Sequence, residues 1–210
     1  MNKKFAALIS IMAILGVSLF IYLDINSDKQ RIELDATKEE VLKEIKDSKE
    51  YTEKTIQLAE GNDQDIGYFH PEHAEHEGKE DPKKDAIKYF IAGLLSNNTD
   101  IFLSSFYVES ISQDLFKSKN PDKDAVTKEI MDKISRNGTL KEILYKVNKG
   151  FLNADSNTIS LTIKYDDQKE ATVNFDLLTL SDSHHEDEIG TYVITTSAWD
   201  IIKQIEASLQ

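Results

Sequence analysis

Cysteine is absent from this sequence of 210 residues. Its absence excludes disulfide bonds, thiolate ligands for a metal and a lipid-modified cysteine as a membrane anchor. Eukaryotic secreted domains of this size more often contain disulfides, so the composition favours a bacterial surface protein. Proline and glycine are also few, with three and eight residues respectively.

Basic residues are outnumbered by acidic ones. The chain contains 25 Lys and Arg residues against 38 Asp and Glu residues, which gives a formal net charge of −13. An acidic surface repels the phosphates of nucleic acids, which are bound by clustered Lys and Arg. We therefore expect no nucleic-acid partner.

Sequence motifs of common enzymes are missing as well. There is no glycine-rich phosphate loop, no cysteine nucleophile and no serine in a nucleophile elbow. The sequence therefore predicts a protein that is not an enzyme, with no catalytic residue and no cofactor-binding residue.

One long apolar run is present near the start of the sequence. Phe5–Leu23 contains no charged residue and no proline and follows Lys3 and Lys4. As a helix it would be about 28 Å long, close to the ~30 Å hydrocarbon core of a bilayer. Small residues that could precede a cleavage site occur only inside the run, at 16–18, which favours an uncleaved anchor over a cleaved signal peptide.

The lysines before the apolar run favour a cytoplasmic N-terminus. The sequence therefore predicts a single-pass protein of the cell membrane, anchored through Phe5–Leu23, whose C-terminal domain lies outside the cytoplasm. In this interpretation residues 1–26 form the transmembrane signal-anchor.

Two polar segments follow the predicted anchor. Residues 27–60 have Glu-to-Lys spacings typical of an exposed helix, for example Glu39 to Lys43. We interpret them as a polar stalk that lifts the domain off the membrane, and the alternative is a helix packed on that domain. Residues 61–82 are acidic and interrupted by Gly and Pro, which is typical of a linker.

Residues 83–210 show helical periodicity first and strand periodicity later. Three helical segments are expected, one covering 86–95, a short one that Asp100 would cap, and one from about 124 that Gly138 would end. Apolar and polar residues then alternate in 143–147, 159–165 and 171–177, with a fourth strand at 191–196 and a closing helix that Ser197 would cap.

This order predicts an α+β domain in which helices pack on a curved antiparallel sheet of about four strands, with a C-terminal helix. The segments DAIKYFIAGLLSNNTDIFLSSF, Arg136-Asn-Gly138, TLKEILYKVN and NTISLTIKY together resemble the NTF2-like superfamily over about residues 82–196. The resemblance implies that the leading helices fill the concavity of the sheet. The final helix from Ala198 departs from the simplest form of that family.

Membrane-anchored members of this superfamily tend to be accessory modules of envelope machinery, whereas others are enzymes with an apolar pocket. The resemblance therefore leaves the function open.

The histidines form two clusters amid acidic residues. Imidazole and carboxylate groups are typical zinc ligands, so the clusters are candidates for a metal site. The first cluster lacks the spacing of the HExxH metalloprotease motif and would not place three histidines on one helix face. A pH sensor and a solvated surface are the other two interpretations. The residues are His70, His73, His76, His184 and His185.

Aromatic residues gather around the second expected helix, and most of them should lie in the core. Any that stay exposed would form an apolar patch suited to a protein partner. The residues are Phe102, Phe106, Tyr107 and Phe116.

The function predicted from the sequence is protein binding or scaffolding in a bacterial envelope, secretion or surface-assembly process. The alternatives are a small-ligand or metal-binding module that uses the sheet concavity or the histidine clusters, and a pocket enzyme. A partner-binding module predicts a filled concavity and an exposed apolar strip. The alternatives predict an enclosed pocket with convergent polar groups. The oligomeric state does not follow from the sequence.

Overall fold

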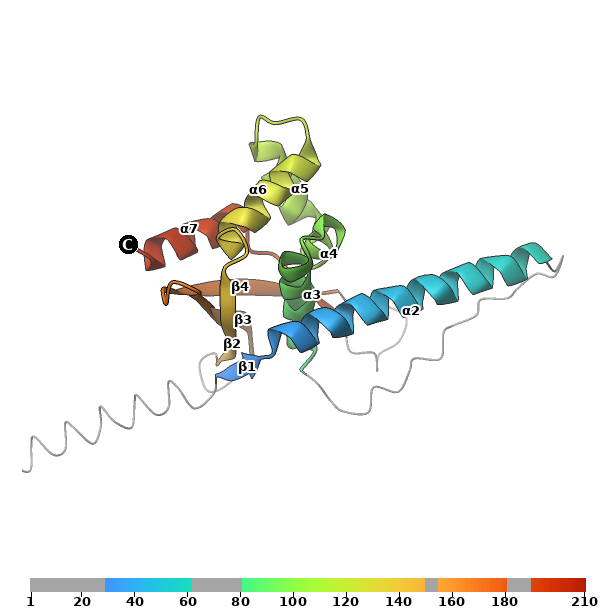
Figure 1. Cartoon of the computed structure of the whole chain (residues 1–210), viewed down its shortest axis with the longest axis horizontal. Coiled ribbons are helices and arrows are strands. Elements are labelled where there is room, and N and C mark those ends of the chain that lie inside the picture. Colours follow the sequence, from blue (N-terminus) through green and yellow to red (C-terminus); the bar gives the residue numbers. More distant parts are fainter. Residues whose placement is uncertain (1–28, 62–80, 150–154, 181–189) are drawn as a thin grey trace, which may run out of the picture.

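The computed structural model describes residues 29–61, 81–149, 155–180 and 190–210 (Figure 1). Over these residues the protein is an α+β structure with helices on one face of an antiparallel sheet. The elements are β1 (Gln30–Ile32), α2 (Leu34–Gly61), α3 (Pro82–Ser96), α4 (Thr99–Ser104), α5 (Val108–Lys117), α6 (Lys123–Ser135), β2 (Leu140–Lys149), β3 (Asp155–Tyr165), β4 (Glu170–Leu180), β5 (Thr191–Ile194) and α7 (Ala198–Ser208).

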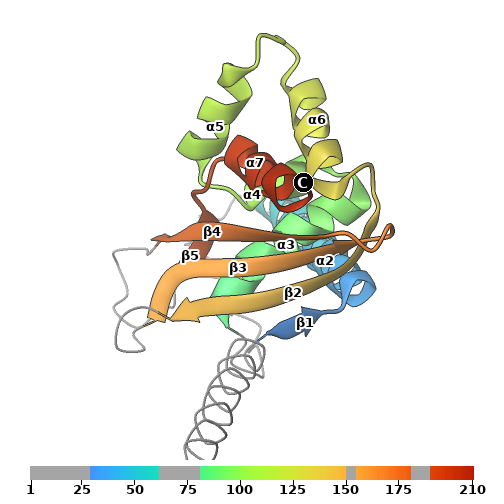
Figure 2. The same ribbon diagram turned by 90° about the vertical axis from the view of Figure 1, so that its left-hand side faces the viewer.

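The sheet has the simple order β1-β2-β3-β4-β5, with every neighbouring pair antiparallel. The alternation predicted for the strands is confirmed, because the apolar residues of 159–165 and 171–177 are buried on one face. Helix α3 packs on this face, where the rings of Phe90 and Phe175 lie 5.3 Å apart. The opposite face is polar and has no helix across it in Figure 2.

The expectation of about four strands is wrong, because the described sheet has five. The additional strand, β1, pairs with β2 through Arg31 opposite Leu144 and Ile32 opposite Ile143. It lies inside 27–60, for which only a helix was expected. A strand of three residues is too short for alternation to be recognised in a sequence.

Helix α2 packs on α3 through its N-terminal half. Lys88 donates to Glu40 at 2.9 Å, and the hydroxyl of Tyr89 donates to Glu44 at 3.1 Å. Val41 is fully buried between these contacts. The side chains of 46–50 are exposed, and the rest of the helix extends away from the body of the protein in Figure 1. The division of the chain into anchor, stalk, linker and domain stays a prediction.

The helices differ from the expected ones in three respects, two at helix ends and one through an additional helix. Asn98, not Asp100, caps α4, because its side chain accepts from the backbone of Ile101. Helix α6 ends at Ser135, before Gly138, and Arg136 caps it in a left-handed conformation with φ of 50°. Helix α5 was not expected, although its apolar residues Val108, Ile111, Leu115 and Phe116 recur at helical spacing.

Within the described residues, no helix combines the length and the apolar character needed to cross a bilayer. The predicted anchor, Phe5–Leu23, lies outside the described residues.

Candidate partner-binding site

The space between the helices and the sheet is filled by core side chains. The ring of Phe90 lies 5.5 Å from Phe102, 6.0 Å from Phe106 and 5.3 Å from Phe175. These rings belong to one continuous cluster that includes the inward-facing residues of β2, β3 and β4. Between the helices and the sheet, the described part of the protein contains closely packed apolar side chains, as expected for a structural core.

The polar groups that enter the core bond to the fold itself. The hydroxyl of Tyr165 donates to the carbonyl of Ile134 at 3.0 Å, and that of Tyr145 donates to Asp81 at 2.8 Å. Burial raises the pKa of Tyr165 to about 12. Among the described residues, no buried side-chain nitrogen or oxygen lacks a hydrogen-bond partner. These buried polar groups therefore stabilise the fold, and within the described residues none is left without a partner for a ligand to bind.

One open groove lies between α6 and α7, with a volume of about 670 Å³. Its walls carry charged side chains that already pair nearby, such as Lys133 with Glu129 at 2.8 Å. An open groove of this kind lacks the enclosure typical of a small-molecule site. The lining residues include Asp132, Arg136, Ile205 and Leu209.

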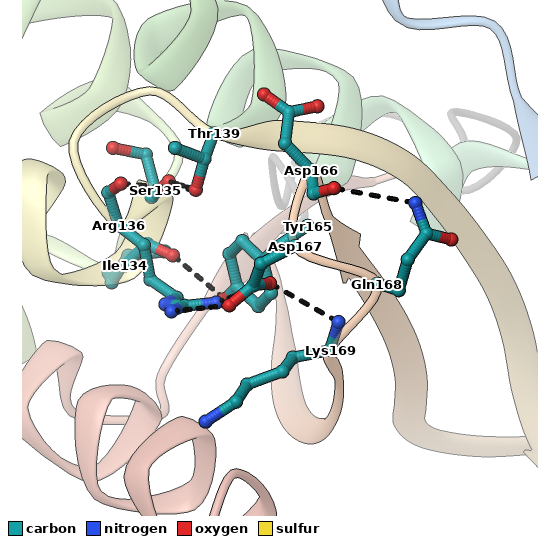
Figure 3. A network of polar contacts seen from close by, with 9 residues as sticks. All are labelled: Ile134, Ser135, Arg136, Thr139, Tyr165, Asp166, Asp167, Gln168 and Lys169. Carbon is teal, nitrogen blue, oxygen red and sulfur yellow. Dashed lines mark hydrogen bonds and ion pairs between the residues drawn. The ribbon is translucent and has the colours of Figure 1, made fainter.

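A polar network at one edge of this groove fixes the end of α6 to the β3–β4 turn (Figure 3). The guanidinium of Arg136 donates two hydrogen bonds to Asp167, both at 2.9 Å, and lies 4.8 Å from the ring of Tyr165. The hydrogen bonds from Arg136 lower the pKa of Asp167. Because the carboxylate and guanidinium satisfy each other, we assign this network to structure.

Within the described residues, one large aromatic side chain is exposed, and it lies on α5. Of the four aromatic residues expected to lie mostly in the core, Phe102 and Phe106 are buried and Tyr107 is half-buried. Phe116, in contrast, is 77% exposed, and Val108 on the same helix is 72% exposed. Aromatic side chains are enriched at protein–protein interfaces relative to the rest of the surface.

The inner side of α5 is fastened to the start of α7 by Asp114, which is only 1% exposed. Its carboxylate accepts from the hydroxyl of Ser197 at 2.7 Å and from the backbone of Ala198 at 2.6 Å. Its backbone carbonyl accepts from the indole of Trp199 at 3.0 Å. Ser197 was expected to cap α7 with its own side chain, but Asp114 supplies the oxygen instead. This connection gives Phe116 a rigid base.

Three lysines lie close to Phe116 in the sequence, and one of them, Lys123, contacts its ring. Lys117 bonds to Asp114 at 2.8 Å, and Lys119 is exposed. The ammonium of Lys123 lies 4.7 Å from the centre of the Phe116 ring and donates to the carbonyl of Leu115. We call Phe116 with these three lysines the Phe116 tip. The connection between α5 and α6, which continues from it, protrudes at the top of Figures 1 and 2.

The residues predicted as metal ligands, His70, His73, His76, His184 and His185, lie outside the described residues. Within the ranges that the structure describes, no group of three His, Cys, Asp or Glu residues is placed to hold a metal ion. The zinc site therefore stays a prediction.

The sequence identified Phe116 as aromatic but gave no signal for Asp114. Its partners on α7 are more than 80 positions away, so no local pattern relates them. Comparison of the chain with protein-family models, with curated proteins and with solved structures found no match.

Proposed function

We propose that this chain is a membrane-anchored, extracytoplasmic module that binds a protein partner in a bacterial envelope, secretion or surface-assembly process. The observation that carries the proposal is the Phe116 tip, an aromatic side chain that is 77% exposed on a helix fixed to the core by Asp114. A rigid base reduces the entropy that an anchor residue loses on binding.

The filled core supports protein binding over binding of a small ligand. A ligand module or a pocket enzyme would need an enclosed cavity with convergent polar groups, and the described core is packed with apolar side chains instead. Membership of the NTF2-like superfamily is part of the proposal, and it rests on the sequence pattern.

The chemistry of the tip indicates the kind of partner. Phe116 fits an apolar pocket, and Lys117, Lys119 and Lys123 favour an acidic rim around that pocket. An aromatic anchor of this kind typically contributes about 2 kcal/mol or more to binding, or roughly thirtyfold in affinity.

Co-purification from membranes of the native host tests the proposal. The full chain would be compared with Phe116→Ser and with Leu180→Ser, a matched loss of an apolar side chain that is 44% exposed on β4. We expect a partner to be retained by the wild type and by Leu180→Ser and lost with Phe116→Ser. Equal retention by all three chains would contradict the assignment of the Phe116 tip.

A further inference from the structure

The first strand, β1, begins only a few residues after the proposed membrane anchor. Strand β1 starts at Gln30, and the apolar run that we propose as the anchor ends at Leu23. The six intervening residues, 24–29, reach at most roughly 20–25 Å when fully extended. The sheet is therefore attached close to the end of the proposed anchor.

Strand β1 is an integral part of the sheet. Ile32 is buried and belongs to the main core cluster, and its neighbour Arg31 pairs with Glu142 of β2 at 3.5 Å. A single residue, Glu33, separates β1 from α2, whose N-terminal half packs on α3. The first residues after the tether are thus fixed to both layers of the domain.

We infer that the domain is held close to the bilayer by its β1 edge, with α2 lying beside the domain and not between the domain and the membrane. This inference rests on the membrane anchor of the proposed function. If α2 were a spacer, its 28 residues would place the domain about 42 Å farther away. The tether length instead limits the separation of the β1 edge from the bilayer to roughly 20–25 Å.

The mounting determines which surface is available to a partner. Strand β1 lies at the lower end of the body in both views, and the α5–α6 connection lies at the upper end (Figures 1 and 2). With β1 beside the bilayer, the α5–α6 connection next to the Phe116 tip lies at the far end of the body. A partner therefore approaches the tip from the aqueous side, in a position that the membrane leaves open.

Energy transfer in proteoliposomes tests the mounting on the full chain. Since the chain has no cysteine, Lys141→Cys introduces a single labelling site on β2, at an exposed position near β1. The acceptor is a lipid dye in the bilayer. A flexible Gly-Ser insertion of twelve residues, which adds roughly 20 Å of reach, is placed either between Asn26 and Ser27 or between Gly61 and Asn62.

We expect the insertion at 26/27 to lower the transfer from residue 141 at least about twofold and the insertion at 61/62 to leave it unchanged. Thermal unfolding followed by the fluorescence of Trp199 confirms that both variants are folded. If the insertion at 61/62 lowered the energy transfer as much as the insertion at 26/27, the inference that β1 holds the domain near the bilayer would be wrong. It would also be wrong if neither insertion changed the energy transfer. Failure of the wild-type chain to float with the liposomes would instead overturn the proposed anchor, so the two failures are distinguishable.

Discussion

Replacing Asp114 with alanine should destabilise the protein more than any other single loss of a charge in the described residues. The carboxylate is buried and accepts two hydrogen bonds at the start of α7, from Ser197 and Ala198. Hydrogen bonds to a charged group contribute about 1.5–3 kcal/mol each. The ion pair with Lys117 adds little, because the lysine side chain is 58% exposed. We expect Asp114→Ala to lower the free energy of unfolding by about 3 kcal/mol or more, out of the ~5–15 kcal/mol typical of a domain.

Urea denaturation followed by Trp199 fluorescence measures this effect, since that indole donates to the carbonyl of Asp114. A loss of about 3 kcal/mol lowers the midpoint by at least about 1 M. Asp114→Asn keeps one acceptor oxygen and should lose about half as much. Asp124→Ala, an exposed carboxylate in the first turn of α6, is the matched control and should cost about 0.5 kcal/mol. If Asp114→Ala changed stability no more than this control, the assignment of Asp114 as the fastening of α5 to α7 would be refuted.

Two further predictions concern the core. A Cβ atom on Gly93 would lie 2.6 Å from the backbone of Phe102, so Gly93→Ala should cost about 3 kcal/mol, whereas Gly138→Ala has open space around it and should cost about 1 kcal/mol because its φ is 81°. Equal losses in denaturation would contradict the close approach of α3 and α4. Burial raises the pKa of Tyr165 to about 12, so the folded state keeps this proton at a pH where the unfolded state, with a pKa near 10, has lost it. The stability from this group is therefore complete below about pH 10 and is lost as the pH rises through about 12. The melting temperature should fall between pH 9 and 11.5, less steeply in Tyr165→Phe, and identical slopes for the two chains would show that this tyrosine is not responsible.

The strands of the sheet could be predicted because each buried face carries a long alternation. Ile159 to Tyr165 and Ala171 to Leu177 alternate over enough residues to exclude a helix, and the structure confirms both. Helix α3 was predictable for the same reason, since its apolar residues repeat with the helical period. Helices and strands with strong local periodicity are the parts of a fold that can be predicted from a single sequence.

Features that depend on distant partners could not be predicted. Strand β1 is defined by its pairing with β2, more than 100 positions later, and three residues carry no pattern of their own. From the sequence, Asp114 is indistinguishable from an ordinary surface carboxylate. It is buried and caps the start of α7 only because α7 packs against α5 in the folded protein. The exposure of Phe116 is equally invisible, since an aromatic residue between Leu115 and Lys117 is compatible with a core position.

The central claim, that the protein acts by binding a partner at the Phe116 tip, is tested most directly by site-specific photocrosslinking in intact cells. A photoreactive phenylalanine analogue would replace Phe116 in one chain and Leu180 in another, both of which are exposed. We expect a discrete crosslinked product at position 116 that is absent at position 180. No product at 116, or the same product at both positions, would contradict the central claim.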